Sequence, residues 1–504
     1  MTVRDGDGVA DAPPGPDRAD HAAPCPSGGR ARPAEAPRSR VGGPDSAHAR
    51  SVARLGLPAR DLAELMAALR PDPGWPGEEA CDVDVEEAAA RCTWSGIAEP
   101  GDRVAGAVIG VLGACAALAS VVDGCSADAL VGAMTEAGLD LEADGRAALV
   151  GEVDGALERW RPRVVRTEAL ARLHAARAVG ALVLVPGDAL WPAGADDLGP
   201  HAPLVLWCTG APDAMAALSR SASIVGARAA TGYGEHVTAE LAAGLVDRGV
   251  AVVSGGAYGI DGAAHRAAVG SGGRTVAFLA GGVDRLYPSG HAELFARMRH
   301  DGAVVSELPC GASPTRWRFL LRNRLIAAVS AATVVVEAGA RSGSLNTANH
   351  AVALERPLGA VPGPVTSVSS SGCHRLLRES QAVCITSADD VMDLLPGWSG
   401  PGKRAHEPDP GGASRPAPQV AAGASRVDAA DPSRPGARTA EVRGDPRVVR
   451  VLDALAVRRG RETADVAARA GLGVAETSSV LGTLELEGAV ARPDGGWVRR
   501  PGSR

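Results

Sequence analysis

Between Ser223 and Leu395, short apolar runs alternate with longer amphipathic stretches, and this alternation restricts the possible folds more than any other feature of the chain. Most of the runs are apolar at successive positions, which indicates strands that are buried on both faces. Strands of this kind, each followed by a helix, form a mostly parallel sheet with helices on both sides, so the sequence predicts an α/β fold. The runs are SIVGA at Ser223, VAVVSGG at Val250, TVAFLAGG at Thr275, AVVSELP at Ala303, TVVVEAG at Thr333, PLGAVPG at Pro357 and VCITSA at Val383.

The regions that flank this alternation differ from it in composition, and a chain of 504 residues is long enough for about three folded units. Two stretches rich in Pro, Gly, Ala and Arg lack apolar periodicity and are expected to be disordered. Elsewhere apolar residues recur every three or four positions, as in 130–141 and 146–160, which predicts helices. The expected organisation is a disordered head at 1–50, a helical module at 51–177, the α/β domain at 178–395, a disordered linker at 396–444 and a small domain at 445–504.

The small C-terminal domain has a pattern of its own. Residues 446–457, 462–470 and 474–486 are expected to form helices. Residues 488–499 are expected to form a hairpin, because Pro493-Asp494-Gly495-Gly496 is typical of a turn. Three helices followed by a hairpin indicate a winged helix.

One stretch, 104–122, contains no charged residue and is long enough to raise the question of a membrane span. Ala, Gly, Cys and Ser dominate it and would insert only weakly, so we expect two buried helices that break near 110–113, and no membrane insertion. The N-terminus has no basic start followed by an apolar run, so a secretory signal is not expected.

Charge and cysteine usage narrow the function. The formal net charge of -7 argues against a protein that coats nucleic acid with its whole surface, so any nucleic-acid site must be local. The nine cysteines are scattered without a CxxC pair, which predicts neither a zinc site nor a disulfide framework. Reduced thiols in the cytosol are the expected state.

Glycines and charged residues collect after the predicted strands, where a parallel sheet binds its ligands. Gly226-Ala227-Arg228 follows the first strand but does not form a GxGxxG motif, so a dinucleotide site is poorly supported and the glycines could serve tight turns alone. The second strand ends in Ser254–Asp261, where glycines permit close approach to an anionic ligand. Asp261 is expected to cap the next helix rather than to catalyse, and His265 to be packed or solvated.

The later loops add arginines and aromatic rings. The third strand ends at Gly281, and the loop after the fourth leads into Arg316-Trp317-Arg318-Phe319 and Arg322-Asn323-Arg324. Cations for phosphates and flat rings for bases are what single-stranded nucleic acid requires. A solvated helical face for Arg322 and Arg324, and a core position for Phe319, are the alternatives. After the fifth strand, 341–344 (RSGS) is suited to a phosphate at a helix N-terminus.

The motifs of common catalysts are missing from the sequence. It contains no GxxxxGK[ST] loop, no nucleophile elbow, no carboxylate pair and no His/Cys cluster with metal spacing. A site lined with arginine and glycine but without an acid–base pair indicates a binding protein rather than an enzyme, and we expect no metal and no cofactor.

Six elements occur in the order typical of the DNA-processing protein A (DprA/Smf) family, which this sequence resembles. Two further segments upstream, 94–102 (WSGIAEPGD) and 186–192 (PGDALWP), are similar to actinobacterial members. The six elements are Gly226-Ala227-Arg228, 254–261 (SGGAYGID), 322–327 (RNRLIA), 341–344 (RSGS), 361–363 (VPG) and Gly372-Cys373.

The resemblance implies a Rossmann-like, doubly wound and mostly parallel sheet, preceded by a helical module and followed by a winged helix. It also implies a cytoplasmic protein that binds single-stranded DNA without sequence preference, loads the RecA recombinase onto it and displaces single-strand-binding protein. Such a protein acts in DNA uptake, natural transformation and recombination, as a homodimer. The helix at 372–380, with Leu376 and Leu377 on its exposed side, falls where family dimers meet.

The resemblance carries DNA-binding roles onto particular residues. Arg228 and Arg324 are expected to contact phosphates, Phe319 to stack on a base, and the backbone of 255–259 to approach the strand. The full set is Gly226, Arg228, Ser254, Gly255, Gly256, Gly259, Asp261, Gly281, Phe319, Arg322, Asn323, Arg324, Arg341, Ser342, Gly343 and Ser344.

Two other functions remain open on the sequence. Rossmann-like relatives that hydrolyse nucleoside monophosphates use a Gly-rich loop and a glutamate, and Glu337 follows a strand as such a residue does, although the PGG-x-GT loop is missing. A transcription regulator would use the winged helix, but its expected recognition helix, 474–486, carries Glu476 and Glu485 and no basic residue. That charge disfavours contact with a duplex backbone.

Overall fold

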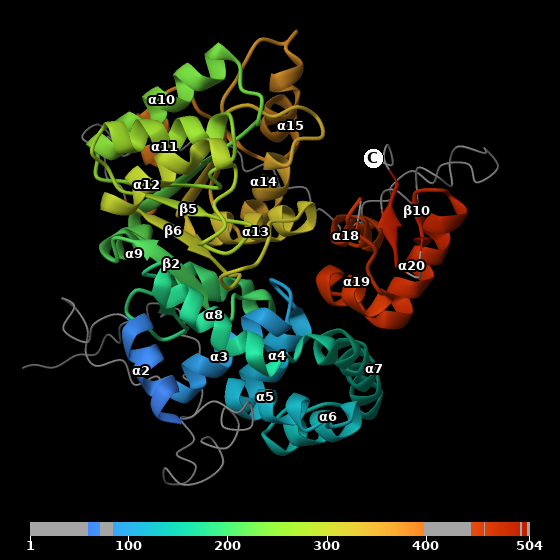
Figure 1. Cartoon of the computed structure of the whole chain (residues 1–504). Helices are drawn as coiled ribbons and strands as arrows, with labels where there is room; N and C mark the ends of the chain where they lie inside the picture. The colour runs from blue at the N-terminus through green and yellow to red at the C-terminus, as the bar shows by residue number, and fades with distance from the viewer. Residues whose placement is uncertain (1–58, 71–83, 398–444, 458, 494–495, 501–504) are drawn as a thin grey trace, which may run out of the picture. The chain divides into compact units, whose positions relative to one another are not determined.

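The computed structural model describes residues 59–70, 84–397 and 445–500, apart from 458 and 494–495 (Figure 1). The predicted head, 1–50, and nearly all of the predicted linker, 396–444, lie outside the described residues.

A nine-stranded sheet forms the centre of the predicted α/β domain, in the order β1-β2-β6-β5-β4-β3-β7-β8-β9. The seven strands from β3 to β9 are parallel, while β1 and β2 run antiparallel at one edge. The predicted mostly parallel sheet is therefore confirmed. Its strands are β1 (Leu182–Leu184), β2 (Leu206–Gly210), β3 (Ser221–Val225), β4 (Ala251–Ser254), β5 (Thr275–Phe278), β6 (Ala303–Ser306), β7 (Ala332–Val335), β8 (Leu358–Ala360) and β9 (Val383–Cys384).

Helices cover both faces of this sheet, because successive strand residues point to opposite sides (Figure 1). Ile224 packs into the cluster that contains Leu241 of α10, whereas the next residue, Val225, packs with Ile326 of α13 on the other face. The doubly wound architecture follows from this alternation. The helices are α9 (Asp213–Ala216), α10 (Gly232–Asp247), α11 (Ile260–Gly270), α12 (Ala292–Asp301), α13 (Arg316–Val329), α14 (Ser344–Ala353), α15 (Ser371–Glu379) and α16 (Ala388–Leu394).

The order of the strands creates a topological switch point between β3 and β7. The chain runs from β3 outward through β4, β5 and β6, then returns to place β7 on the other side of β3. Loops after β3 and β7 therefore leave the sheet in opposite directions and separate at its carboxyl edge. In open α/β sheets this is the position at which ligands bind.

The N-terminal region is helical, as predicted, and packs on β1 and β2. Trp94 and Trp160 meet edge to face at 5.1 Å in its core, which also includes Val183 of β1 and Trp207 of β2. Its helices are α2 (Ala59–Leu69), α3 (Val85–Ile97), α4 (Arg103–Leu112), α5 (Ala114–Val122), α6 (Ala127–Glu136), α7 (Ala143–Trp160) and α8 (Arg166–Ala178).

The uncharged stretch 104–122 forms the two helices that the sequence predicts. α4 and α5 meet at Gly113, which has a φ of 81°, and the helices bend by 113° there. Val108 and Leu118 are buried in the core. Among the described residues, no single helix has the length and apolar composition needed to cross a membrane, and only this bent pair meets that test when taken together.

The C-terminal domain is a winged helix, as predicted. Val451, Val466, Leu481 and Trp497 form its small core. The two strands pair antiparallel, Val490 opposite Arg499. Its elements are α18 (Pro446–Ala454), α19 (Thr463–Ala470), α20 (Val474–Leu486), β10 (Val490–Ala491) and β11 (Val498–Arg499).

Candidate functional site

Glu337, at the end of β7, holds the two sides of the switch point together. Its backbone carbonyl accepts a hydrogen bond of 2.7 Å from the amide of Ala227. Its buried carboxylate accepts bonds from the Thr231 amide at 2.9 Å and the Thr231 hydroxyl at 2.7 Å, at the N-terminus of α10. Because both carboxylate oxygens accept hydrogen bonds from Thr231, the residue that caps α10, Glu337 is poorly placed to act on a substrate, which disfavours the nucleotide-hydrolysing alternative.

The glycines of the edge loops admit neighbouring parts of the chain. A Cβ on Gly259, whose φ is 75°, would lie 2.2 Å from the carbonyl oxygen of Ala227, so this glycine lets the β3 and β4 loops meet. Tight packing of the fold therefore accounts for these glycines. A Cβ would likewise lie 2.5 Å from Ile260 at Gly226, 2.3 Å from Arg322 at Gly255, 2.7 Å from Phe295 at Gly256 and 2.9 Å from Pro314 at Gly281.

Ser254 and Asp261 shape the loop between β4 and α11 from inside. The Ser254 hydroxyl is buried and donates to the carbonyl of Ile224 at 2.6 Å. Asp261 accepts from the amides of Gly255 at 3.2 Å and Ala257 at 3.4 Å. These amides belong to the preceding loop and not to α11, so the predicted helix cap is wrong, and Asp261 instead orders the loop before the helix. Burial raises the pKa of Asp261, against the opposing effect of the nearby Arg322 guanidinium.

Arg322, Asn323 and Arg324 correct the sequence-based expectation, because the structure buries all three. Arg322 donates to the carbonyls of Gly255, at 2.7 Å, and Phe278. Burial lowers the pKa of its guanidinium to about 10. Asn323 donates to the carbonyl of Gly343 at 3.3 Å. These side chains tie α13 to three loops of the carboxyl edge and lie almost wholly out of contact with solvent.

Arg324 lies furthest from its predicted role. Its Nη1 and Nη2 atoms each lie 2.8 Å from a carboxylate oxygen of Glu307, and its Nε donates to the carbonyl of His201 at 3.0 Å. Arg324 lies five residues after Phe319 on the same helix. Each residue turns the side chain by about 100°, so Arg324 points to a different face of α13 than Phe319 does. The structure therefore does not place Arg324 beside Arg228 and Phe319.

Arg228 and Phe319 do come together at the switch point. The exposed guanidinium of Arg228 lies over the Phe319 ring, 4.9 Å from its centroid. The ring of Tyr287, from the loop after β5, meets Phe319 edge to face at 5.5 Å. Phe319 is half-buried, so it is neither a core residue nor fully open. A cation and two aromatic rings thus share one exposed position at the end of the sheet.

The loop after β7 brings a second exposed cation to this edge. Arg341 and Gly343 are exposed, and Asn323 of α13 holds the loop through the Gly343 carbonyl. The hydroxyls of Ser342 and Ser344 lie 2.7 Å apart at the start of α14. Of the four arginines in the predicted set, Arg228 and Arg341 remain exposed.

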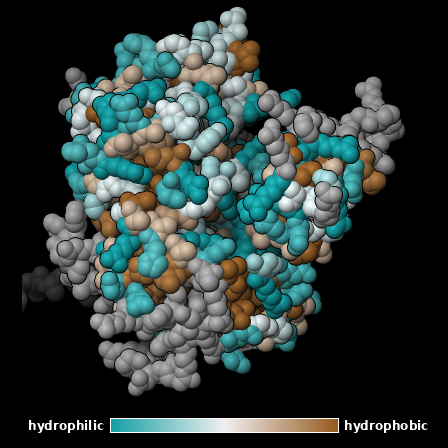
Figure 2. Space-filling view, viewed as in Figure 1, coloured by the Kyte–Doolittle hydropathy of each residue, from teal (hydrophilic) through white to brown (hydrophobic). Residues whose placement is uncertain are grey.

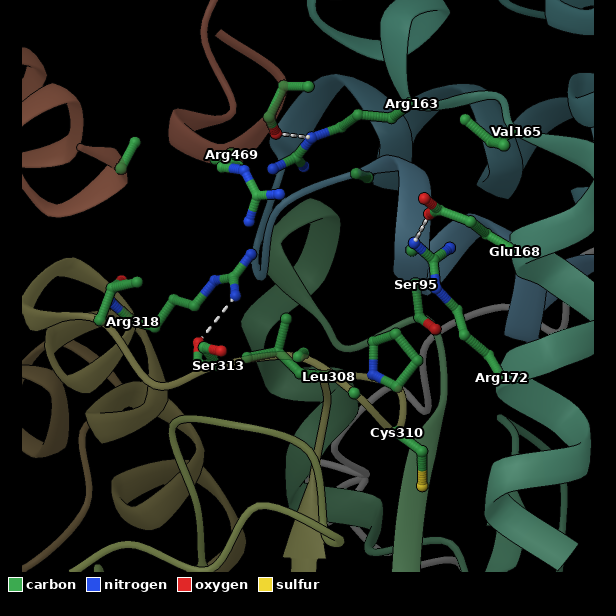
Figure 3. A pocket seen from close by; sticks show the side chains of 18 of the residues that line it. Ser95, Arg163, Val165, Glu168, Arg172, Leu308, Cys310, Ser313, Arg318 and Arg469 are labelled. Atoms are coloured by element: carbon green, nitrogen blue, oxygen red, sulfur yellow. Dashed lines mark hydrogen bonds and ion pairs between the residues drawn. The ribbon is translucent and has the colours of Figure 1, made fainter. Parts of the chain in front are cut away.

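The first turn of α13 faces the helical module, across a hollow shown in Figure 3. Arg318 donates to the two carboxylate oxygens of Glu99 at 2.9 and 3.1 Å and to the carbonyl of Ser313 at 2.9 Å. Arg163 pairs with the same carboxylate. Although burial alone would raise the pKa of Glu99, the guanidinium groups of Arg318 and Arg163 hold it well below its usual range. Glu99 therefore joins the two modules as a carboxylate.

Two family models match the chain. The model of DNA recombination-mediator protein A matches residues 182–396, and that of the DprA winged helix domain matches residues 435–496. The DNA processing protein DprA of Mycobacterium tuberculosis is 44% identical over 329 residues, which cover 63% of this chain and 77% of that protein. This chain belongs to the DprA family.

Other DprA-family proteins are similar over shorter spans. The protein Smf of Escherichia coli is 34% identical and covers 55% of this chain and 67% of its own length. A structure described as showing the single-stranded DNA binding mode of DNA processing protein A from Helicobacter pylori is 27% identical, covers 42% of this chain and 94% of its own, and has a TM-score of 0.38.

The expectation that Leu376 of this DprA-family chain lies on the surface, where a dimer partner could contact it, is wrong. Leu376 of α15 is 2% exposed and packs in the core with Cys373. Leu377 is partly buried against the same core. The single apolar face of α15 packs against the sheet. The exposed side of the helix therefore consists of charged residues such as Arg375 and Arg378.

Tyr258 and Tyr287 are exposed at the site, and sequence reasoning passed over both of them. They are 48% and 47% exposed, in the loops that follow β4 and β5. A signal was available, because the DprA-family chain has only three tyrosines and all three follow predicted strands. Aromatic side chains are enriched in binding interfaces relative to the rest of a protein surface, so their exposure here was informative.

The remaining titratable groups do not form a catalytic cluster among the residues that the structure describes, and no three His, Cys, Asp or Glu side chains there could hold a metal. His265 was expected to be either packed or solvated, and it is packed. It is buried, with Nδ1 2.7 Å from the Thr275 hydroxyl. Burial lowers its pKa to about 3, so it is a neutral core residue of this DprA-family fold.

Proposed function

We propose that this protein binds single-stranded DNA at the carboxyl edge of its sheet. The observation that carries the proposal is the position of the Arg228 guanidinium over the ring of Phe319, at 4.9 Å, beside an exposed Tyr287 at the topological switch point. Flat rings bind unpaired bases by stacking, and a guanidinium binds phosphate. Membership of the DprA family supports the same assignment.

Single strands are favoured over a duplex because stacking on a side chain requires a base that is free of its partner. Every base has a flat face, so stacking tolerates all sequences. The exposed side chains at the switch point are rings and guanidinium groups that suit base faces and phosphates, and we propose binding without sequence preference. The DNA acts as a ligand and is not altered, so no catalytic role is assigned.

Family membership extends the proposal to partners. The protein delivers the bound strand to the RecA recombinase, displaces single-strand-binding protein, and works as a homodimer in the cytoplasm during DNA uptake and recombination. The winged helix is assigned no duplex contact, because the charged residues of α20 are the half-buried Glu476 and the exposed Glu485.

Substituting the two central residues tests this function. We expect Arg228→Ala and Phe319→Leu each to weaken binding of an oligothymidylate by roughly 5- to 100-fold, since a charge-assisted phosphate contact and a stacked base each contribute about 1–3 kcal/mol. The measurement is fluorescence anisotropy at low salt, with a duplex of the same length as competitor. Arg297→Ala is the matched control, because Arg297 is an exposed arginine in the middle of α12. Preference for the duplex, or equal binding by all variants, would overturn the proposal.

A further inference from the structure

The three tyrosines of this chain share an unusual exposure. Tyr233, Tyr258 and Tyr287 are 43%, 48% and 47% exposed, although Phe278 and Phe295 are fully buried. All three lie in loops or helix starts that follow β3, β4 and β5, and so at the carboxyl edge of the sheet.

Tyr233 has a structural explanation that the other two lack. Its hydroxyl donates to the carbonyl of Pro362 at 2.6 Å and so joins the start of α10 to the loop after β8. The hydroxyls of Tyr258 and Tyr287 form no hydrogen bond with any of the described residues. A hydrogen bond from the hydroxyl, which explains the position of Tyr233, therefore does not explain the positions of these two rings.

Both rings are held in place from one side. Tyr258 meets the ring of His291 edge to face at 4.8 Å, and His291 is fixed by its Nδ1 contact of 3.0 Å with the Gly256 carbonyl. Gly290 lies directly beneath Tyr258, where a Cβ would stand 2.5 Å from the tyrosine oxygen. Tyr287 belongs to the same loop and rests against Phe319. Each ring is thus oriented by neighbours while about half of its surface stays open.

We propose that Tyr258 and Tyr287 are two further base-stacking positions, which extend the site from Phe319 across the ends of β5 and β4. The inference rests on the proposed function and adds the path of the strand: successive unstacked bases lie over Phe319, Tyr287 and Tyr258. Anchored rings lose little conformational entropy when a base stacks on them, which favours binding. The ligand is a run of at least three unpaired nucleotides with intact bases.

Paired substitutions separate stacking from other effects. Tyr258→Leu and Tyr287→Leu remove the flat ring and keep apolar bulk, whereas Tyr258→Phe and Tyr287→Phe keep the ring and remove the hydroxyl. Two probes are used: an oligothymidylate of about 16 nucleotides, and an oligomer of the same length in which every base is replaced by an abasic site. The full-length chain is used throughout, and its thermal unfolding verifies that each variant folds.

We expect each leucine variant to bind the oligothymidylate roughly 5- to 100-fold more weakly, and each phenylalanine variant to bind it like the unaltered protein. Binding of the abasic oligomer should change in none of them, since it offers phosphates without rings. Leucine variants that bind the oligothymidylate normally would overturn the inference and leave the proposed function intact. Equal losses on both probes would also overturn it. Failure of the unaltered protein to bind either probe would instead reject the proposed function itself.

Discussion

Arg324 is 4% exposed and forms a two-point ion pair with Glu307. Both charged groups are buried, and the attraction between them offsets the free energy lost when each was removed from water. Removing one partner of such a pair leaves an unpaired buried charge, while replacing both by apolar residues is often tolerated. Arg324 therefore contributes to the fold, and only indirectly to any ligand site.

A substitution series at this pair tests that assignment. Arg324→Ala should reduce the free energy of unfolding by about 3–5 kcal/mol, because Glu307 is left buried and unpaired. The double variant Arg324→Met with Glu307→Leu should recover much of that loss. Chemical denaturation followed by circular dichroism measures both. An Arg324→Ala protein of normal stability that no longer binds single-stranded DNA would show that the arginine contacts the ligand after all.

Arg228 presents the opposite case at the same scale. Its guanidinium is exposed and rests on a ring, so it can exchange the Phe319 face for a phosphate with little rearrangement. Arg322 also lies near this ring, 5.9 Å from its centroid, but it is buried and its Nη1 atom already donates to the carbonyls of Gly255 and Phe278. Of the two arginines near this ring, only Arg228 is exposed to a ligand.

At the scale of elements, α13 connects the helical module to three loops at the carboxyl edge of the sheet. Its first turn reaches the helical module through Arg318 and Glu99, and its middle reaches the β4, β5 and β7 loops through Arg322 and Asn323. Phe319 lies on the same helix. Any shift of α13 would therefore move the stacking ring together with the loops around it.

The contact between α13 and the helical module should depend on pH. The pKa of Glu99 is lowered in the folded protein, so its stabilising effect is fully present above the unfolded value of about 4.3. It is lost as the pH falls toward the lower folded value. We expect the unaltered protein to exceed Glu99→Gln in melting temperature by a constant amount between pH 5 and pH 8, as a rough range, and the difference to shrink in more acidic buffer. Differential scanning calorimetry across pH measures this, and a difference that grows on acidification would contradict it.

For the whole molecule, the net charge of -7 means that DNA binding must arise from a small area. Figure 2 shows polar residues interleaved with small apolar patches over the visible face. The exposed cations assigned to the site are Arg228 and Arg341. A strand held by two such contacts and by stacking should respond only weakly to salt.

Salt titration makes this expectation quantitative. For single strands the logarithm of the binding constant falls by about 0.7 per phosphate contact for each tenfold rise in salt. Two contacts predict a slope near -1.4, and Arg341→Ala should bring it closer to -0.7. Anisotropy titrations between about 50 and 200 mM salt measure the slope. A value steeper than about -4 would mean that a much larger basic surface takes part.

Local patterns of sequence were sufficient to predict the helices and strands and the class of the fold. The apolar runs at Thr275 and Thr333 form β5 and β7. The uncharged stretch around Gly113 forms two core helices with a bend between them. These outcomes depend on the spacing of apolar residues within a few neighbouring positions. That spacing can be read without knowing which distant part of the chain each element packs against. The parallel sheet and the winged helix follow from such spacing alone.

Tertiary structure decided which side chains of the site remain available. Arg228 and Arg324 both follow motif patterns, yet one lies over a ring in solvent and the other is enclosed by Glu307 and the carbonyl of His201. Leu376 was expected on the surface and entered the core. Tyr287 became part of the site because β5 and α13 meet there. Sequence spacing determines that a residue lies in a helix or loop, but the free energy of burying its charge or ring depends on neighbours that are distant in the chain.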